Sequence, residues 1–429
     1  MVNQNELLVW AEIRGESRLV GSIRAGEGGA EFTYGEEFLE SGDAAALSIS
    51  LPLRKEPFGA SETKNFFDGL LPEGFTRKSV AKWMHADSGD YLSILEGLGS
   101  ECLGAIRITP ARIKEEEPHY EKLSDEQVIA LAREGATTSA QIVTKAHLSL
   151  TGASGKVGLY YHGSDDTWFL PTGTAASTHI VKQSHVRLNQ IVANEQLTLM
   201  TAKRCGLDVP ESFIVSCGTD NEEEVLFATK RYDRSISGDS RRVDGLTLPS
   251  RLHQEDFAQA LGMPAAQKYE QEPQGYLHKI FDLLRRCSSD PVRDQLRLWD
   301  ALVFNYLTGN TDAHLKNYSL LYSEDLKSVR LAPFYDMLST AVYDSCTRDM
   351  SFYIGDECSL DEISRESFRA AASMAGLGVK MAMRRFDAMA DQFENALREA
   401  AEELAGLGFS NVWEIREKIL ARGGAAGIR

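Results

Sequence analysis

The chain has 429 residues, of which 43% are apolar and 25% charged. This composition excludes a single small domain, a collagen-like chain and a disordered, low-complexity protein. Its 46 basic and 63 acidic residues give a formal net charge of −17, so direct contact with nucleic acid would require a local basic patch. No apolar run approaches membrane-spanning length and the amino-terminal MVNQNELLVW does not resemble an export signal, so we expect a cytoplasmic protein.

The cysteines are scattered along the chain without a CxxC pair, and no histidine lies near them at ligand spacing. This pattern predicts reduced thiols and argues against a zinc site or a disulfide framework. The residues concerned are Cys102, Cys205, Cys217, Cys287, Cys346 and Cys358.

The amino-terminal quarter is dominated by short alternating or β-branched runs, which predict strands. They are LLVWAEI, RLVGSIRA, ALSISLPL and LGAIRITP. We therefore expect a β-rich module over residues 1–112. A charged, turn-prone linker over 113–144 follows, with a helix start at Ser124.

The rest of the chain predicts a second β-rich unit and then a helical one. Residues 145–233 carry the strand candidates KAHLSL, VGLYYH, TWFLPT, HIVKQS, FIVS and VLFATKRYD around one helix, LNQIVANEQLTLMTAKRCG. Residues 234–429 carry the amphipathic runs QEDFAQALG, GYLHKIFDLLRR and VRDQLRLWDALVFNYLTG, two short strand candidates, YSLLYS and VRLAPF, and an Ala-rich helical tail from Ser367. The order predicts an α+β, two-lobed fold of the kind found in phosphotransferases, preceded by the amino-terminal β-rich module.

The strongest chemical signal is the polar run GNTDAHLKN, which directly follows an apolar helix. Asp312 and Asn317 are five residues apart, the separation used in phosphotransfer loops. There the carboxylate accepts a proton from the attacking hydroxyl and the amide oxygen holds magnesium. Asp336, in APFYDMLS, would complete a site of the oxygen ligands that magnesium prefers. The alternative is that Asp312 and Asn317 only cap a turn.

Two weaker signals lie upstream. Gly152, Ala153, Ser154, Gly155 and Lys156 join two strand candidates, and such short residues let backbone N–H groups approach phosphates, although an ordinary hairpin turn would look the same. Lys182, in HIVKQS, and Glu195, in the following helix, have the order of the lysine and carboxylate of a kinase small lobe. The alternative places Lys182 on a solvated strand face. ATKRYDR would then be the crossover between lobes, with Tyr232 beside the adenine.

In their order along the chain, several strings resemble the HipA-type kinases, the toxin half of bacterial toxin–antitoxin pairs. They are LTGASGK, HIVKQ, VANEQLTLMTAKRCGLDVP, KRYDR, RLHQEDFAQALG, GNTDAHLKNYSLLY and LAPFYDMLST. The resemblance implies a Ser/Thr protein kinase fold that uses ATP and magnesium. It assigns Asp312 as the catalytic base, Asn317 and Asp336 as metal ligands, and as nucleotide contacts Thr151 to Lys156, Lys182, Lys230, Arg231, Tyr232, Gln254, His314, Lys316 and Tyr335. For His314 a role in hydrogen-bonding the loop is the equal alternative.

The resemblance also implies self-inactivation by autophosphorylation. Ser149, in a Ser-x-x-Gly position before the glycine loop, matches the family's site, and a phosphate there adds negative charge where ATP must lie. Two features depart from the usual pattern. Ser154 and Gly155 replace the middle residues of the common family loop, which makes Ser154 a second candidate site. His314 stands where eukaryotic-type kinases carry lysine.

The family's targets are aminoacyl-tRNA synthetases, and its partner is a HipB-like helix-turn-helix antitoxin that contacts operator DNA. Lys380, Arg384 and Arg385 would either touch that DNA or form a solvated helix face. Two functions from other classes stay open at this point: a catalytically idle corepressor that binds the antitoxin, and a small-molecule phosphotransferase.

Overall fold

The computed structural model describes residues 6–26, 28–112, 116–134, 156–183, 188–216 and 224–428. The chain divides into two compact units, and each is built from distant segments. Unit 1 comprises Met1–His185, Val215–Ala265 and Leu320–Val329; unit 2 comprises Val186–Ile214, Ala266–Ser319 and Arg330–Arg429. Among the described helices, none combines the length and apolar character needed to cross a membrane.

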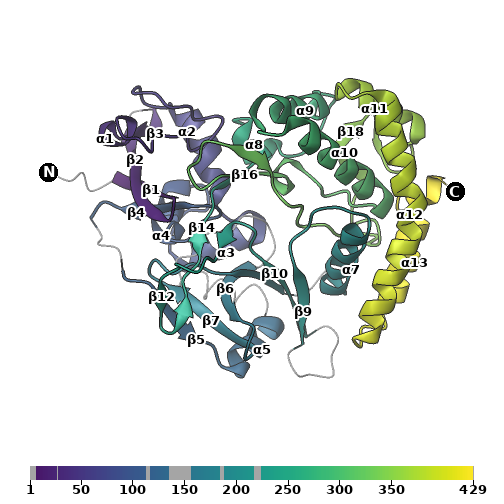
Figure 1. Ribbon diagram of the computed structural model, residues 1–429, viewed down its shortest axis with the longest axis horizontal. Coiled ribbons are helices and arrows are strands. Elements are labelled where there is room, and N and C mark those ends of the chain that lie inside the picture. The colour runs from purple at the N-terminus through teal and green to yellow at the C-terminus, as the bar shows by residue number, and fades with distance from the viewer. Residues whose placement is uncertain are drawn as a thin grey trace. The chain divides into compact units, whose positions relative to one another are not determined.

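An antiparallel sheet forms the amino-terminal part of unit 1 (Figure 1), in the strand order β3-β2-β1-β4. Its strands are β1 (Glu6–Ile13), β2 (Glu16–Gly26), β3 (Gly29–Tyr34) and β4 (Ile106–Pro110). Side chains alternate along β1, so that Leu7, Val9, Ala11 and Ile13 are buried while their neighbours are partly exposed, as one face of a half-buried strand requires. The helices between β3 and β4 are α1 (Glu36–Leu39), α2 (Ala60–Phe67), η1 (Asp68–Leu70), α3 (Gly74–Trp83) and α4 (Tyr91–Leu98).

The prediction of a strand at ALSISLPL is wrong. This segment makes only an isolated bridge between Ser48 and Leu51. The Ser48 hydroxyl and the Ile49 N–H instead donate to the carboxylate of Glu255. The side chain of Glu255, distant in the sequence, therefore accepts hydrogen bonds from this segment, including one from a backbone N–H that could otherwise bond to a neighbouring strand.

The second sheet of unit 1 has six strands in the order β5-β7-β6-β8-β10-β9. They are β5 (His119–Lys122), β6 (Lys156–His162), β7 (Thr167–Thr172), β8 (His179–Gln183), β9 (Ser212–Ser216) and β10 (Val225–Lys230). The strands predicted at VGLYYH, TWFLPT and FIVS are confirmed, and HIVKQS is confirmed over its described residues. The strand predicted at VLFATKRYD is confirmed only as far as Lys230, where β10 ends. The one predicted at KAHLSL lies outside the described residues.

The helix start predicted at Ser124 is also confirmed. Helix α5 spans Asp125–Glu134. The hydroxyl of Ser124 accepts from the N–H of Gln127 (3.3 Å), whose side-chain oxygen accepts from the N–H of Ser124 (2.8 Å), a reciprocal cap. Strand β5 precedes this helix, so part of the predicted linker belongs to the second sheet.

QEDFAQALG was expected to be a helix, and this is wrong for its first residues. Residues Gln254–Asp256 form β15, and only Phe257–Ala260 form the helix α8, because Asp256 is its N-cap and accepts from the N–H of Gln259. Strand β15 pairs with β16 (Ser319–Tyr322), which pairs with β17 (Val329–Leu331). Two small hairpins precede it, made by β11 (Arg234–Ser235) with β14 (Ser250–Arg251) and by β12 (Arg242–Val243) with β13 (Leu246–Thr247).

Unit 2 is mainly helical. Its central helix α10 (Pro291–Thr308) packs against α9 (Tyr276–Cys287) and the long α12 (Val379–Gly406) (Figure 1). The other helices are α7 (Ile191–Arg204), η2 (Ala265–Gln267), α11 (Arg365–Met374), α13 (Val412–Arg422) and α14 (Ala425–Ile428). A hairpin of β18 (Asp349–Ile354) and β19 (Glu357–Ser359) was not predicted.

Helix α10 has a defined start and a defined stop. The Asp290 carboxylate accepts from the N–H of Arg293, and Pro291 occupies the first turn, where no N–H is needed. Gly309 ends the helix at φ 69°, and a Cβ there would lie 2.6 Å from the Cβ of Ala341. Glycine is therefore required where the helix passes into the polar loop.

Candidate active site

The loop predicted to carry catalysis is fixed directly to the end of α10. The N–H of Thr311 donates to the hydroxyl of Thr340 (2.7 Å), and the side-chain amide of Asn310 donates to that of Asn305 (3.0 Å). Both anchoring side chains, Asn310 and Thr311, are buried. Asp312 thus follows a rigid backbone, as a reactive group requires.

Asp312 and Asn317 are in contact across this loop. The side-chain N–H of Asn317 donates to the backbone carbonyl of Asp312 (2.8 Å), and the short helix η3 (Leu315–Asn317) ends at Asn317. This bond is one that the turn-capping alternative predicts, and the catalytic role of Asp312 and the metal-binding role of Asn317 stay predictions. The bond uses only the amide nitrogen of Asn317, so it does not consume the amide oxygen.

Hydrogen bonds on both sides of Asp336 hold it beside the same loop. The hydroxyl of Tyr335 donates to the carbonyl of Lys316 (3.0 Å), and the hydroxyl of Ser339 donates to the carbonyl of Thr308 (2.6 Å). Asp336 itself has φ 56°, a left-handed conformation that aspartate tolerates better than most residues and that recurs at functional sites. The structure thus brings together two segments that sequence spacing alone could not join.

His314 and Lys316 are buried within the loop. The His314 ring packs edge-on against Tyr269, with 5.0 Å between ring centroids. This contact supports a loop-ordering role for His314, and its contact with a nucleotide stays a prediction. Tyr269 also donates a hydrogen bond from its hydroxyl to Oδ1 of Asp312, a partner that sequence reasoning missed.

In unit 1, two predicted phosphate-binding lysines are neighbours. Lys156 on β6 lies opposite Lys182 on β8 in antiparallel register, so both side chains project from the same face of the sheet. Lys182 is only 8% exposed, and its ammonium lies 5.3 Å from the ring centroid of Phe227. The solvated-face alternative for Lys182 is therefore wrong. Glu195 lies on α7 in unit 2, where it is buried, and its pairing with Lys182 stays a prediction.

The predicted crossover segment begins where β10 ends, at Lys230. Arg231 follows, and its side chain is fully buried in an ion cluster. The hydroxyl of Tyr232 donates to the side-chain oxygen of Gln254, whose amide nitrogen donates to Asp233 (3.0 Å). Gln254 and Tyr232 are thus tied to each other and to the cluster next to the crossover.

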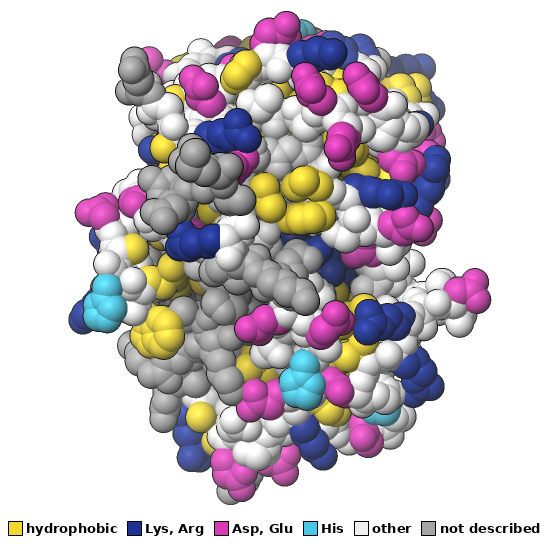
Figure 2. All heavy atoms as spheres, turned by 90° about the vertical axis from the view of Figure 1, so that its left-hand side faces the viewer, with side chains coloured by type: hydrophobic (Ala, Val, Ile, Leu, Met, Phe, Trp, Pro, Cys, Tyr) yellow, Lys and Arg dark blue, Asp and Glu magenta, His cyan; other side chains and the backbone are white. Residues whose placement is uncertain are grey.

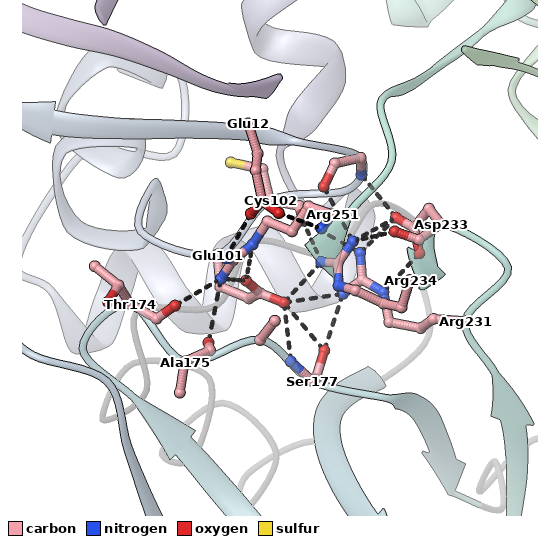
Figure 3. Close-up of polar contacts among 12 residues, drawn as sticks. Glu12, Glu101, Cys102, Thr174, Ala175, Ser177, Arg231, Asp233, Arg234 and Arg251 are labelled. Atoms are coloured by element: carbon pink, nitrogen blue, oxygen red, sulfur yellow. Dashed lines mark hydrogen bonds and ion pairs between the residues drawn. The ribbon is translucent and has the colours of Figure 1, made fainter. Parts of the chain in front are cut away.

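The ion cluster joins the amino-terminal module to the crossover. Figure 3 shows the guanidinium groups of Arg231, Arg234 and Arg251 directed toward the carboxylates of Glu101 and Asp233. Arg251 contacts Glu101 at 2.6 Å, Arg234 contacts Glu101 at 2.8 Å, and Arg231 contacts Asp233 at 2.7 Å. The pairs are separated by as many as 150 positions in the sequence, so no local motif indicated them.

The arginines keep both carboxylates charged in spite of burial. Burial alone would raise the pKa of Glu101 and of Asp233. The positive charges outweigh this effect: Arg251, Arg234 and Arg231 lower the pKa of Glu101, and Arg231 and Arg234 lower that of Asp233. Both carboxylates therefore stay ionised at physiological pH, as the balancing of buried arginine charges requires.

Several predicted site residues lie outside the described residues. They are the candidate autophosphorylation site Ser149 and the glycine-loop residues Thr151, Gly152, Ala153, Ser154 and Gly155, while Lys156 is described as the first residue of β6. Cys217 also lies outside them; the other five cysteines are free thiols.

The candidate DNA-contacting residues lie on α12. Arg385 makes an ion pair with Asp300 on α10, which satisfies its charge within the protein.

Figure 2 shows the face at the left of Figure 1, where the described Lys and Arg side chains are interspersed with Asp and Glu. On that face, the described side chains thus do not form the extended basic surface that nucleic-acid backbones select.

The fold and the loop chemistry together define a kinase-like phosphotransferase of the α+β class. Residues 148–401 match the family model of the HipA-like C-terminal domain, and residues 11–109 match the HipA N-terminal domain. The chain therefore belongs to the HipA family, and it is a kinase of that family.

Relatives and a solved structure agree with this assignment. The chain is 34% identical over 403 residues to the putative kinase Y4mE of Sinorhizobium fredii, covering 91% of this chain and 92% of that one. It is 28% identical over 359 residues to the serine/threonine-protein kinase toxin HipA of Shewanella oneidensis, covering 81% and 78%. The HipA, HipB and operator DNA complex of Shewanella oneidensis matches with a TM-score of 0.79 at 24% identity, over 97% of this chain and 96% of that one, which confirms the fold.

Proposed function

We propose that this protein is a Ser/Thr protein kinase that transfers the γ-phosphate of ATP to a protein hydroxyl and acts as the toxin of a toxin–antitoxin pair. The observation that carries the proposal is the joining of the Asp312–Asn317 loop to the segment of Asp336 through Tyr335 and Ser339. These hydrogen bonds within unit 2 connect the two segments, and Asp312, Asn317 and Asp336 are residues of the types that phosphotransfer uses.

In this proposal Asp312 accepts the proton of the attacking hydroxyl. Asn317 fits a magnesium ligand because its amide oxygen is not used by the bond that braces the loop, and the carboxylate of Asp336 is the second ligand. Magnesium would neutralise charge between the phosphates. Both ligands are the hard oxygen donors that this ion prefers.

Lys156 and Lys182 are proposed to bind the phosphates. The two residues lie opposite each other on neighbouring strands, so both side chains project from one face of the sheet, where they could contact the same polyphosphate. The adenine is proposed to lie at Lys230–Tyr232. Because the Arg231 side chain is buried in the ion cluster, this residue would contribute its backbone. Gln254, His314, Lys316 and Tyr335 are proposed to complete the nucleotide site.

The toxin role is supported by the similarity to the Shewanella oneidensis kinase toxin HipA. We propose a HipB-like antitoxin as partner, with operator DNA contacted mainly through that antitoxin, as in the complex containing HipA, HipB and operator DNA. The proposed acceptor is a serine or threonine of an aminoacyl-tRNA synthetase in the cytoplasm. Autophosphorylation at Ser149 is proposed to silence the enzyme.

The test is phosphotransfer by purified protein given radiolabelled ATP and magnesium, with itself and a panel of aminoacyl-tRNA synthetases as acceptors. Asp312→Ala should abolish labelling. The matched control is Asp387→Ala on α12, which removes a carboxylate paired only at the surface with Arg365 and should label normally. Equal labelling by Asp312→Ala would overturn the catalytic assignment.

Two measurements separate the rival functions. In an ATP-binding assay, an idle corepressor would show no magnesium-dependent binding. In the labelling assay, a small-molecule phosphotransferase would label sugars or aminoglycosides and leave proteins unlabelled. Mass spectrometry of the labelled protein tests self-inactivation: phosphate is expected on Ser149, and Ser149→Ala should remain active for longer. Phosphate on Ser154 instead would assign the regulatory role to Ser154 and not to Ser149.

A further inference from the structure

Tyr269 lies where its hydroxyl touches the proposed catalytic base. Its phenol donates a hydrogen bond to Oδ1 of Asp312, and its ring packs edge-on against His314 in the same loop. We propose that Tyr269 is a positioning residue that fixes the carboxylate of Asp312 for proton transfer. This inference rests on the proposed function.

The backbone around Tyr269 is anchored on both sides of the residue. The carbonyl of Lys268 accepts from the N–H of Leu315 (3.2 Å), so the preceding residue is joined to the catalytic loop itself. The N–H of Glu270 donates to the carbonyl of Ser351 (3.0 Å). Residues on each side of Tyr269 thus hold its ring at a defined distance from Asp312.

Further bonds make this anchor rigid. The buried carboxylate of Glu270 accepts from the backbone N–H groups of Gln274 (2.8 Å), Tyr276 (3.0 Å) and Tyr353 (3.1 Å). The hydroxyl of Tyr276 donates to the carbonyl of Gln267 (2.8 Å). A tyrosine held in this way provides a fixed hydrogen-bond donor, although its side chain is 39% exposed.

The role follows from the geometry of a carboxylate. The torsion that rotates a carboxylate is broad and has no strong preference of its own. A fixed donor on Oδ1 restricts that rotation and so holds the carboxylate in one orientation toward the substrate hydroxyl. The hydroxyl oxygen then bonds to the γ-phosphorus, the bond from that phosphorus to the bridging oxygen of ADP breaks, and the proton passes to the carboxylate of Asp312.

The test compares Tyr269→Phe with the wild-type full chain. The variant keeps the ring against His314 and removes only the donor, so we expect kcat to fall about 10- to 100-fold while the KM for ATP and the binding of magnesium-ATP stay unchanged. Tyr306→Phe is the matched control, because that phenol donates to the carbonyl of Ile363. It should lower Tm without lowering kcat.

A double-mutant cycle checks the contact without relying on activity. Tyr269→Phe and Asp312→Ala each remove the same hydrogen bond, so their effects on Tm should be less than additive. Additive effects, or a Tyr269→Phe kcat equal to or above that of an active wild type, overturn the positioning role alone. A wild-type protein that transfers no phosphate overturns the proposed function together with it.

Discussion

Asn194 and Ser339 exchange two hydrogen bonds. The side-chain N–H of Asn194 donates to the carbonyl of Ser339 (2.8 Å), and its side-chain oxygen accepts from the N–H of Ser339 (3.1 Å). The hydroxyl of Ser339 in turn donates to the carbonyl of Thr308 at the end of α10. A single buried amide on α7 therefore fixes the backbone three residues after Asp336.

We expect Asn194→Ala to impair both stability and phosphotransfer. The substitution leaves two buried backbone groups without partners, which should lower the free energy of unfolding by about 2–4 kcal/mol. It also loosens the segment of Asp336, so kcat should fall while urea unfolding reports the loss of stability. The control, Gln196→Ala, removes one bond from the same helix to the carbonyl of Ser212. If the control lowers kcat equally, the specific role of Asn194 is wrong.

A second prediction concerns the end of α10. Gly309 combines a positive φ with a close neighbour, whereas Gly206 has φ 83° and nothing within 4 Å of its ideal Cβ. Gly206→Ala should therefore lower the free energy of unfolding by only about 1–2 kcal/mol, the penalty of a left-handed conformation for a residue with a Cβ. Gly309→Ala should cost about 2–5 kcal/mol, because overpacking adds to it. Thermal unfolding of the two variants gives the comparison. Equal losses of stability would mean that Ala341 moves aside without an energetic penalty.

The buried ion cluster leads to a third prediction. Glu101→Gln leaves buried guanidinium groups with one charge fewer to balance them, and we expect a loss of about 3–5 kcal/mol in the free energy of unfolding. Glu16→Gln, at a surface pair with Arg18, should change that free energy by less than about 1 kcal/mol. Chemical unfolding measures both. A loss for Glu101→Gln no greater than for Glu16→Gln would contradict the electrostatic account.

Glu255 leads to a prediction on pH. Burial, with a smaller contribution from Asp256, raises the pKa of this carboxyl to about 7 from the ordinary 4.5, although Ser48, Tyr322 and the N–H of Ile49 donate to it. Between these values the folded protein holds a proton that the unfolded chain has released. The stabilisation is therefore complete below pH 4.5 and is lost as the pH rises to about 7, a change of about 3 kcal/mol.

Glu255→Gln should remove this dependence. Urea unfolding of the wild type and the variant at about pH 5 and about pH 8 isolates the contribution of Glu255 as the difference between their pH slopes. The variant should lose less stability than the wild type on going to the higher pH. Parallel slopes would show that the carboxyl does not titrate in this range.

The loop that we propose to be catalytic could be located from the sequence because its signal is local. A polar run after an apolar helix stands out in the sequence, and α10 fills the whole of the predicted helix up to Gly309. The proximity of Asp336 to that loop was only an expectation from order along the chain, because it depends on bonds such as Tyr335 to Lys316. Tyr269 gave no signal, since it lies 43 positions from Asp312 in a segment without a motif.

The errors in the predicted elements have a common cause. The run ALSISLPL alternates like a strand and QEDFAQALG has the periodicity of a helix. Neither forms the whole of the predicted element, and both contribute residues to the surroundings of the Glu255 carboxyl. This side chain lies on β15 and bonds to Ser48, Ile49 and Tyr322. Long-range bonds to this buried carboxyl override local preference, and neither segment carries a sequence signal for them.

The position of the ion cluster determines how the protein can be divided. Glu101 and the backbone of Cys102 and Gly104 belong to the amino-terminal part, and they receive or supply hydrogen bonds for Arg231, Asp233 and Arg234. A fragment that began after residue 112 would lack Glu101, so three arginines that are buried in the full chain would keep only Asp233 of their two principal counter-ions. The amino-terminal module is thus needed for the rest of unit 1 to fold, so gene fusions or truncations that separate the two should yield insoluble products.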